Sequence, residues 1–386
     1  MEWKEVRLGD VCNIITGFPF PGKKYSKEGI RVVRGDNVTI GNLRWDTEKD
    51  KRWNEPFDKT EYYSLQANDI VIGMDGSRVG KNKARIKEED LPLLLAQRVA
   101  CVRHNELAEQ DYLYYNIFSK KFIDYVNSIH TGSAIPHISQ KQIEDYKILL
   151  PNLETQRRIA SILSSLDRKI ELNNKINTDL EEMAQAIFKN WFVDFEPFKD
   201  GKFVDSELGM IPEGWKVVKL GDFFPVKTGK KDANTASVNG KYPFFSCSQN
   251  ALCTDSYSFD CDAILVAGNG DFNVKWYSGK FDAYQRTYVL IPYNKKLLAL
   301  LYYVVKRNLL TITSKARGSV IRFITKGNLT DFEFAIPRDL ENNEIVDVFK
   351  SINEKIFANI KENSRLSLLR DTLLPRLMSG ELEVPE

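Results

Sequence analysis

Two glutamine–arginine pairs combine side chains that are suited to reading DNA bases. Gln97-Arg98 lies in "AQRV" and Gln285-Arg286 lies in "YQRT". A glutamine amide can form two hydrogen bonds with the edge of adenine, and an arginine guanidinium can do the same with guanine. The same residue types occur on ordinary solvated surfaces, so each pair taken alone leaves that alternative open.

Basic residues gather in both halves of the chain. In "SRVGKNKAR", Lys81, Lys83 and Arg85 occupy alternate positions, so they would share one face of a strand or ribbon and suit a phosphate backbone. The candidate DNA-binding residues are Arg78, Lys81, Lys83, Arg85, Gln97, Arg98, Thr131, Ser133, His137, Lys275, Gln285, Arg286, Lys315, Arg317, Ser319 and Arg322. A solvated charged face explains any one of them equally well. Their occurrence in both halves favours DNA.

The segment "GFPFPGKK" (Gly17 to Lys24) imitates a phosphate-binding loop but lacks two of its requirements. Lys24 stands where a serine or threonine hydroxyl would bind magnesium, and Pro19 and Pro21 lack the backbone N–H groups that hold phosphate. The chain also contains no G-x-G-x-x-G, no H-E-x-x-H and no G-x-S-x-G, and its three histidines are few for acid–base or metal chemistry. The sequence predicts no catalytic residue, no metal site and no cofactor bound to this chain.

The composition limits the class of protein. Of the 386 residues, 42% are hydrophobic, which is ordinary for globular cores, and the length suggests two or three domains. The formal net charge of +2 does not indicate a partner. No apolar run approaches the roughly 18 residues of a membrane span. The five cysteines show no C-x-x-C pairing. We expect a cytoplasmic protein with reduced, mostly buried thiols and no membrane association.

The chain contains an internal repeat. "WKEVRLGDVCNIITG", which begins at Trp3, matches "WKVVKLGDFFPVKTG", which begins at Trp215, at eight of fifteen positions. Farther along, "GSAIPHISQKQIEDYKILLP" from Gly132 aligns with "GSVIRFITKGNLTDFEFAIP" from Gly318. The offset between the copies falls from 212 to 186 residues, so the second copy is 26 residues shorter. Repetition over so long a period predicts two related globular segments, each followed by one helix.

Each globular segment is followed by a long stretch with apolar residues at three- and four-residue spacing. The predicted stripe residues are Ile159, Ile162, Leu166, Ile170, Asn173, Leu180 and Ile187 in the first copy and Ile352, Ile356, Asn359, Leu366 and Leu373 in the second. Each stripe is the simplest partner for the other, which predicts a coiled coil whose register the asparagines could fix. Two alternatives stay open: the asparagines face solvent, or the helices are core helices of separate compact domains.

The predicted fold is α+β, with two globular domains separated by two long antiparallel helices and related by a pseudo-twofold axis. The expected boundaries are 1–152 for the first domain, 153–195 for the first helix, 196–214 for a linker, 215–338 for the second domain, 339–380 for the second helix and 381–386 for a tail. The middles of the two domains differ, which predicts that they read different sequences.

Several segments of the chain resemble the specificity subunits of type I restriction–modification systems. They are "WKEVRLGD", "GSAIPHIS", "PNLETQRRIASILSSLDRKIELNN", "AIFKNWFVDFEPF", "SELGMIPEGW" and "LLPRLMSGELEV", and together they span nearly the whole chain. The second helix departs from the family's pattern, because "LENNEIVDVFKSINEKI" replaces the usual E-Q-x-x-I beginning. This departure leaves the details of one partner contact open.

The resemblance implies a division of labour among subunits. Each globular segment would be a target recognition domain that reads one half of a bipartite site in double-stranded DNA, and the helices would fix the gap between the half-sites. Two modification subunits would carry S-adenosylmethionine and methylate adenine. A restriction subunit would supply translocation and cleavage that depend on ATP and magnesium. Two rival interpretations remain: a coiled-coil scaffold that binds only proteins, and a nuclease or methyltransferase of unfamiliar type.

Overall fold

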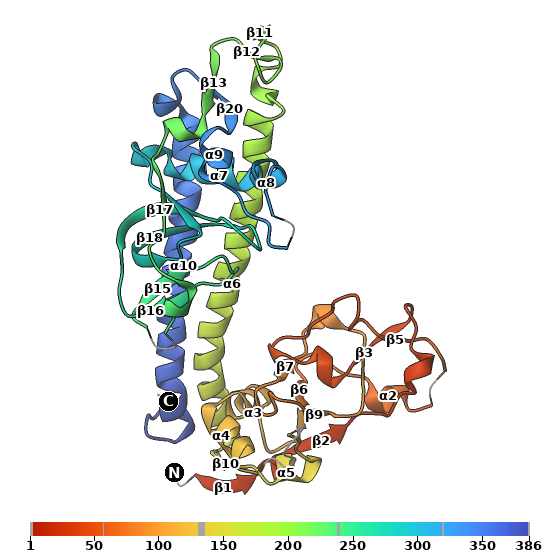
Figure 1. Cartoon of the computed structure of the whole chain (residues 1–386). Helices are drawn as coiled ribbons and strands as arrows, with labels where there is room; N and C mark the ends of the chain where they lie inside the picture. The colour runs from red at the N-terminus through yellow and green to blue at the C-terminus, as the bar shows by residue number, and fades with distance from the viewer. Residues whose placement is uncertain (1–2, 57, 130–135, 238–239, 319, 385–386) are drawn as a thin grey trace. The chain divides into compact units, whose positions relative to one another are not determined.

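The computed structural model describes residues 3–56, 58–129, 136–237, 240–318 and 320–384. Contacts within the chain divide it into two compact units, Met1–Glu171 together with Asn363–Glu386, and Leu172–Glu362. Each unit contains one copy of the repeat and one segment of each long helix (Figure 1). The second unit is continuous in sequence, whereas the C-terminal end of the chain completes the first.

The first unit is an α+β domain with two mixed sheets. Its strands are β1 (Lys4–Arg7), β2 (Cys12–Thr16), β3 (Ile30–Val33), β4 (Ile40–Gly41), β5 (Arg52–Trp53), β6 (Ile70–Gly73), β7 (Lys83–Arg85), β8 (Leu93–Leu95), β9 (Val99–His104) and β10 (Lys147–Leu150). Its helices are α1 (Leu8–Val11), α2 (Thr60–Tyr63), α3 (Gln110–Ile117), α4 (Lys120–Ile129), α5 (Gln140–Glu144) and the first part of α6 (Leu153–Phe192). The strand orders are β2-β9-β6-β7-β4 and β5-β3-β8, and β1 pairs with β10. Every residue of β6 is buried, as an apolar run in a central strand requires.

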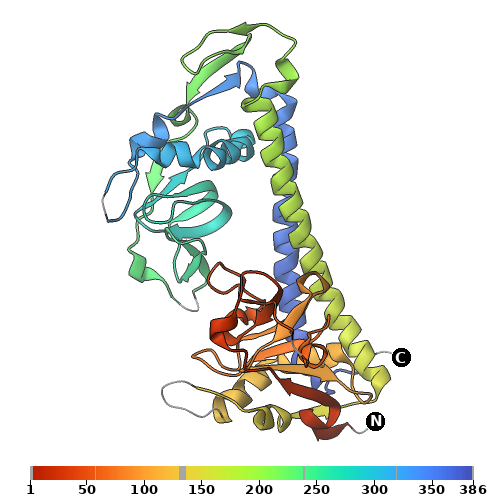
Figure 2. The ribbon, with the colours of Figure 1, turned by 90° about the vertical axis from the view of Figure 1, so that its right-hand side faces the viewer.

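The second unit repeats this plan with a six-stranded sheet. Its strands are β11 (Phe203–Val204), β12 (Ile211–Pro212), β13 (Trp215–Lys219), β14 (Val226–Thr228), β15 (Tyr242–Phe245), β16 (Leu252–Thr254), β17 (Phe259–Ala267), β18 (Val274–Ala283), β19 (Thr287–Leu290) and β20 (Glu333–Pro337). Its helices are α7 (Leu298–Arg307), α8 (Leu309–Ser314), α9 (Lys326–Thr330) and most of α10 (Glu344–Met378). The strand order is β14-β19-β17-β18-β15-β16, and β13 pairs with β20. Helix α7 is buried between this sheet and the long helices (Figure 2).

The Leu-Gly-Asp motif of the repeat follows the first strand in both copies, at residues 8–10 and 220–222. The leucine is fully buried in each. The aspartate carboxylate accepts a hydrogen bond from the backbone N–H three residues earlier, from Arg7 at 3.2 Å and from Lys219 at 2.9 Å. The motif therefore recurs because it anchors and caps the same turn twice.

The repeated tryptophans hold the segments that follow the long helices. In the second unit, the ring centroid of Trp215 lies 5.2 Å from that of Phe195 and 5.2 Å from that of Phe198. In the first unit, Gly380 adopts φ +75° just after α10, and a Cβ added there would lie 3.3 Å from the ring of Trp3. Each tryptophan thus packs against the chain where it leaves a long helix.

Helices α6 and α10 contact each other in both units. In the first unit, Arg370 of α10 donates a hydrogen bond to the Asp167 carboxylate of α6 at 2.7 Å. In the second unit, the ring of Phe349 in α10 lies 6.3 Å from that of Phe188 in α6, within one buried cluster. The alternative of two core helices without mutual contact is therefore wrong.

Asn173 and Asn359 are 1% and 2% exposed, so the alternative that they face solvent is also wrong. Asn173 Nδ2 donates to Glu362 Oε2 at 2.7 Å, and Asn359 Nδ2 donates to Asn177 Oδ1 at 2.8 Å. As α6 advances by four residues, its partner in α10 recedes by three, which confirms the antiparallel direction.

The predicted stripe residues differ in burial. Ile159 and Ile352 are buried, as the two asparagines are. The remaining eight are half-buried: Ile162, Leu166, Ile170, Leu180, Ile187, Ile356, Leu366 and Leu373. A pair of helices shields each stripe on the side of its partner and leaves its margins open to water.

Candidate nucleic-acid interface

The two Gln-Arg pairs occupy corresponding turns. Gln97-Arg98 joins β8 to β9, and Gln285-Arg286 joins β18 to β19; all four residues are exposed. Arg98 O accepts a hydrogen bond from Met74 N at 2.9 Å, and Arg286 O accepts one from Gly268 N at 2.8 Å. Each donor directly follows a strand whose last residues are buried, β6 in the first unit and β17 in the second. The same backbone frame therefore positions both turns.

A Thr-Gly pair lies beside each turn, and its glycine allows close approach. A Cβ on Gly17 would lie 2.2 Å from Ala96 O, and a Cβ on Gly229 would lie 2.2 Å from Ala283 O. No other residue type fits at this distance from a carbonyl oxygen. This contact gives a physical reason for the Thr-Gly match in the repeat.

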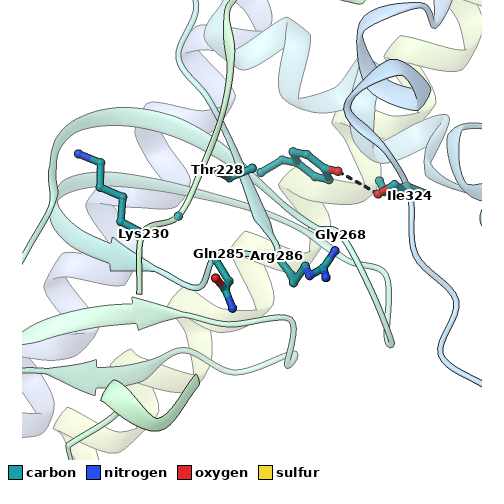
Figure 3. A pocket seen from close by; sticks show the side chains of 8 residues that line it. Thr228, Lys230, Gly268, Gln285, Arg286 and Ile324 are labelled. Carbon is teal, nitrogen blue, oxygen red and sulfur yellow. Dashed lines mark hydrogen bonds between the residues drawn. The ribbon is translucent and has the colours of Figure 1, made fainter. Parts of the chain in front are cut away.

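Each turn borders an open pocket. The pocket in the second unit has a volume of about 440 Å³. It is lined by Thr228, Gly229, Lys230, Gly268, Gln285, Arg286, Tyr288 and Ile324. Its counterpart in the first unit, of about 510 Å³, is lined by Thr16, Gly17, Met74, Asp75, Gln97, Arg98, His137, Ile138 and Ser139. In the second unit, Gln285 and Arg286 point in different directions from one turn, and the Tyr288 hydroxyl donates to Ile324 O at 2.8 Å (Figure 3).

These linings contain residues that the sequence reasoning missed. Thr16 and Thr228 line the two pockets at the same repeat position. Their identity in the repeat alignment is the signal that could have identified them. Asp75 gave no such signal, because the two copies are most different in the middle.

The turn of the first unit is strained and charged. Arg98 adopts φ +67°, which residues other than glycine seldom adopt. Its side chain is 68% exposed, and its Nη1 lies 2.8 Å from Asp75 Oδ2. His137 is exposed at the rim of the same pocket and forms an antiparallel bridge with Asp75. The turn therefore presents a guanidinium that is already partly oriented.

The prediction that Lys81, Lys83 and Arg85 form a face suited to a phosphate backbone is wrong for Lys83. This residue is 3% exposed, and its Nζ donates to Gly80 O at 3.0 Å and lies 5.0 Å from the ring centroid of Phe122. Burial lowers the pKa of Lys83 to about 7. Residue alternation predicts which side chains share a face of β7, but here aromatic rings of α3 and α4 cover that face. Lys83 does not reach a surface that DNA could contact.

Arg85 lies on the same covered face. Its guanidinium lies 5.0 Å from the ring centroid of Tyr114 and forms an ion pair with Asp111. Arg78 and Lys81 are exposed in the turn before β7. Two of the four cations predicted in this segment thus remain open to solvent.

In the second unit, one candidate cation, Lys275, lies in β18, and the others lie between α8 and α9. Lys315, Arg317 and Arg322 are exposed. Lys275 is half-buried, its Nζ donates to Ser248 O at 2.7 Å, and burial lowers its pKa. Lys275 is therefore the least available of these cations to a ligand.

Three candidates, Thr131, Ser133 and Ser319, lie outside the described residues. Over the residues that the structure does describe, no group of three or more His, Cys, Asp or Glu side chains could hold a metal ion. In the same part of the chain, no helix is long and apolar enough to cross a membrane. Both pockets offer an amide, a guanidinium and a threonine hydroxyl for hydrogen bonds, and the first unit adds the Asp75 carboxylate.

Comparison with known proteins identifies relatives for both copies. The family model described as "Type I restriction modification DNA specificity domain" matches residues 1–182 and 212–366. The MjaIX specificity subunit of a type I restriction enzyme from Methanocaldococcus jannaschii is 30% identical over 305 residues, covering 72% of this chain and 70% of the relative. The EcoDI specificity subunit from Escherichia coli is 40% identical over 178 residues, 45% of this chain. That match spans 40% of the EcoDI subunit.

A solved structure has the same fold. The S subunit of a type I restriction–modification system from M. genitalium aligns with a TM-score of 0.62 at 14% identity, covering 98% of this chain and 96% of the other. The α+β fold with paired long helices is thereby confirmed.

Proposed function

This chain belongs to the family of type I restriction–modification DNA specificity proteins, and we propose that its two globular domains each read one half of a bipartite site in double-stranded DNA. One observation carries the proposal above all others: two exposed Gln-Arg turns are held by the same backbone frame next to pockets with different linings. The same frame places both turns at equivalent positions in their domains, and the different linings let the two half-sites differ in sequence.

The chain itself contributes no catalytic residue under this proposal. Two modification subunits, which bind S-adenosylmethionine and methylate adenine, and a restriction subunit, which uses ATP and magnesium, complete the complex. Exposed apolar side chains on the helices support docking of such partners. They are Leu368 and Leu369 in the first unit, and Leu172, Met183, Val348 and Ile360 in the second, all 40–70% exposed. The complex acts on chromosomal and invading DNA and therefore works in the cytoplasm.

The paired helices supply the spacing between half-sites. Helix α6 is continuous across the boundary between the units at residues 171 and 172. Helix α10 is continuous across the boundary at residues 362 and 363. The buried asparagine contacts stabilise one register over its neighbours, because a slipped register would leave buried amides without partners. A fixed register gives a fixed length, and B-DNA advances about 3.4 Å per base pair.

A salt-titrated binding assay tests the proposal. We expect the full chain, co-expressed with its modification subunits, to bind duplex DNA with an affinity that falls steeply as salt rises, by about 0.9 log units per tenfold salt increase for each phosphate neutralised. Arg286→Ala should weaken binding. Arg338→Ala removes the same charge from an exposed position just after β20 and should not. Affinity that is indifferent to salt, with partner subunits still retained on purification, would favour the protein-binding scaffold instead.

A further inference from the structure

The two pockets differ by one carboxylate at an equivalent position. Asp75 follows Met74, whose N–H donates to Arg98 O; Asn269 follows Gly268, whose N–H donates to Arg286 O. Each also forms the same antiparallel bridge, Asp75 with His137 and Asn269 with Phe323. Asn269 therefore occupies in the second unit the place of Asp75 in the first.

This difference changes the state of the neighbouring arginine. Arg98 forms an ion pair with Asp75 at 2.8 Å and is held in a left-handed backbone conformation. Arg286 forms no ion pair with any residue in the described ranges, and neither does Lys230, which lines the same pocket. The first turn thus presents a compensated, oriented guanidinium. In the second turn the Asp232 carboxylate accepts a hydrogen bond from Gln285 Nε2 at 2.8 Å, and the Arg286 guanidinium has no carboxylate partner among the described residues.

The carboxylate selects what the arginine can bind. A phosphate approaching Arg98 would also approach the like charge of Asp75, and this repulsion disfavours the DNA backbone as its partner. The edge of guanine is neutral and suffers no such repulsion. With Nη1 tied to Asp75, Arg98 still has the Nε and Nη2 donors for the O6 and N7 acceptors of guanine.

The opposite holds for the second turn. Because Asp232 bonds to Gln285 and no carboxylate among the described residues pairs with Arg286, the Arg286 guanidinium can attract a backbone phosphate, and the neutral Asn269 side chain does not repel one. Contacts with phosphate position a protein on the duplex but carry no sequence information.

We propose that Asp75 is the residue that commits the Arg98 turn to reading a guanine in the first half-site, while Asn269 leaves the Arg286 turn to hold a backbone phosphate. This inference rests on the proposed DNA-binding function and assigns different tasks to two turns that the repeat makes look alike. Asp75 acts as a positioning residue, since it works through Arg98.

Reciprocal exchange tests the inference. The recognised site is first defined by mapping methylated adenines in cells that contain the complete system. Affinity is then measured by fluorescence anisotropy over a range of salt concentrations for the full complex with duplexes that carry single base changes in each half-site. The variants are Asp75→Asn, Asn269→Asp, the conservative Asp75→Glu, and Arg98→Lys, which keeps the charge but loses the planar fork.

For Asp75→Asn we expect a loss of discrimination at one guanine of the first half-site, ~5- to 150-fold, which corresponds to a lost two-bond contact. The slope of log affinity against log salt concentration should become steeper by about 0.9, the change expected for one more phosphate contact, because Arg98 becomes free to bind phosphate. Asp75→Glu should retain most discrimination. Arg98→Lys should lose the same discrimination without making the salt slope shallower. Asn269→Asp should make this slope shallower by about 0.9, the change expected for the loss of one phosphate contact. It should leave base discrimination in the second half-site unchanged.

Three results would overturn the inference. One is a first half-site in which no guanine matters. Another is an Asp75→Asn variant that binds every sequence more weakly by the same factor, as a merely structural residue would cause. The third is an Asn269→Asp variant with an unchanged salt slope. Failure of the broader function would look different, since the unsubstituted complex would then show no salt-dependent DNA affinity at all.

Discussion

Lys83 offers a test that separates a buried structural lysine from a DNA-binding one. Its Nζ donates to one carbonyl oxygen and faces the rings of Phe118 and Phe122, at 5.4 and 5.0 Å from their centroids. No carboxylate pairs with it among the described residues. Burial therefore disfavours its charged form and lowers its pKa from 10.5 to about 7. We expect Lys83→Met to remove a pH dependence of stability and to leave DNA affinity unchanged.

The size of the effect follows from this pKa difference. Below pH 7 the lysine is protonated in both the folded and the unfolded chain, and folding carries the full cost of burying the charge, about 5 kcal/mol at about 1.4 kcal/mol per pH unit. Between pH 7 and 10.5 the unfolded chain keeps a proton that the folded chain has lost. The free energy of unfolding therefore rises with pH in this window. From pH 7 to 9 the gain from Lys83 is about 2 kcal/mol, because the folded lysine is still half protonated at pH 7.

Equilibrium urea unfolding at pH 7, 8 and 9 measures this dependence. Lys83→Met should be more stable than the unsubstituted chain at pH 7, and the difference should shrink by about 2 kcal/mol at pH 9. Lys81→Met, at an exposed neighbouring position, serves as the control. Its free energy of unfolding should depend on pH in the same way as that of the unsubstituted chain. Parallel pH profiles for Lys83→Met and the unsubstituted chain would refute the burial argument, as would a shallower salt slope for DNA binding in that variant.

Three further predictions concern packing, the pocket frame and spacing. Phe349→Ala, at a fully buried ring of α10, should destabilise the second unit by about 3–5 kcal/mol in urea unfolding, and a loss below 1 kcal/mol would contradict the packing described for that unit. Gly17→Ala would place a Cβ about 1 Å inside an ordinary contact with a carbonyl oxygen, so it should shift the Gln97-Arg98 turn and relax only the first half-site in methylation maps. Degeneracy in both halves would count against separate readers. Four residues inserted after Ile170 in α6, with four more after Ser364 in α10, add about 6 Å to each helix. The DNA spacer should then lengthen by one to two base pairs, with both half-sites intact. An unchanged spacer would contradict the role of the helices in spacing.

The repeat made the architecture predictable from the sequence. Leu-Gly-Asp, Thr-Gly and Gln-Arg recur because each serves the same local contact twice, in a cap, a close approach and a turn. The three-and-four spacing of apolar residues predicted two helices that pair, and they do. Periodicity records which face of an element is apolar, and a long element gives enough residues to read it.

Features that depend on tertiary contacts could not be predicted in the same way. The alternation of Lys81, Lys83 and Arg85 gave no sign that α3 and α4 would cover the shared face. Asn173 and Asn359 were correctly placed in the stripes, but their partners, Glu362 and Asn177, depend on a register that one sequence does not contain. Asp75 lies in the part where the two copies diverge, so its pairing with the arginine turn appears only in space.

Genome-wide mapping of methylated adenines, in cells with the complete system and either the unsubstituted chain or Gln97→Ala, tests the central claim most directly. The account predicts a bipartite motif with a fixed gap that depends on this chain, and a Gln97→Ala map in which the first half-site becomes degenerate while the gap and the second half-site stay as they were. A methylation pattern that is the same without this chain, or a substitution that alters both half-sites together, would contradict it.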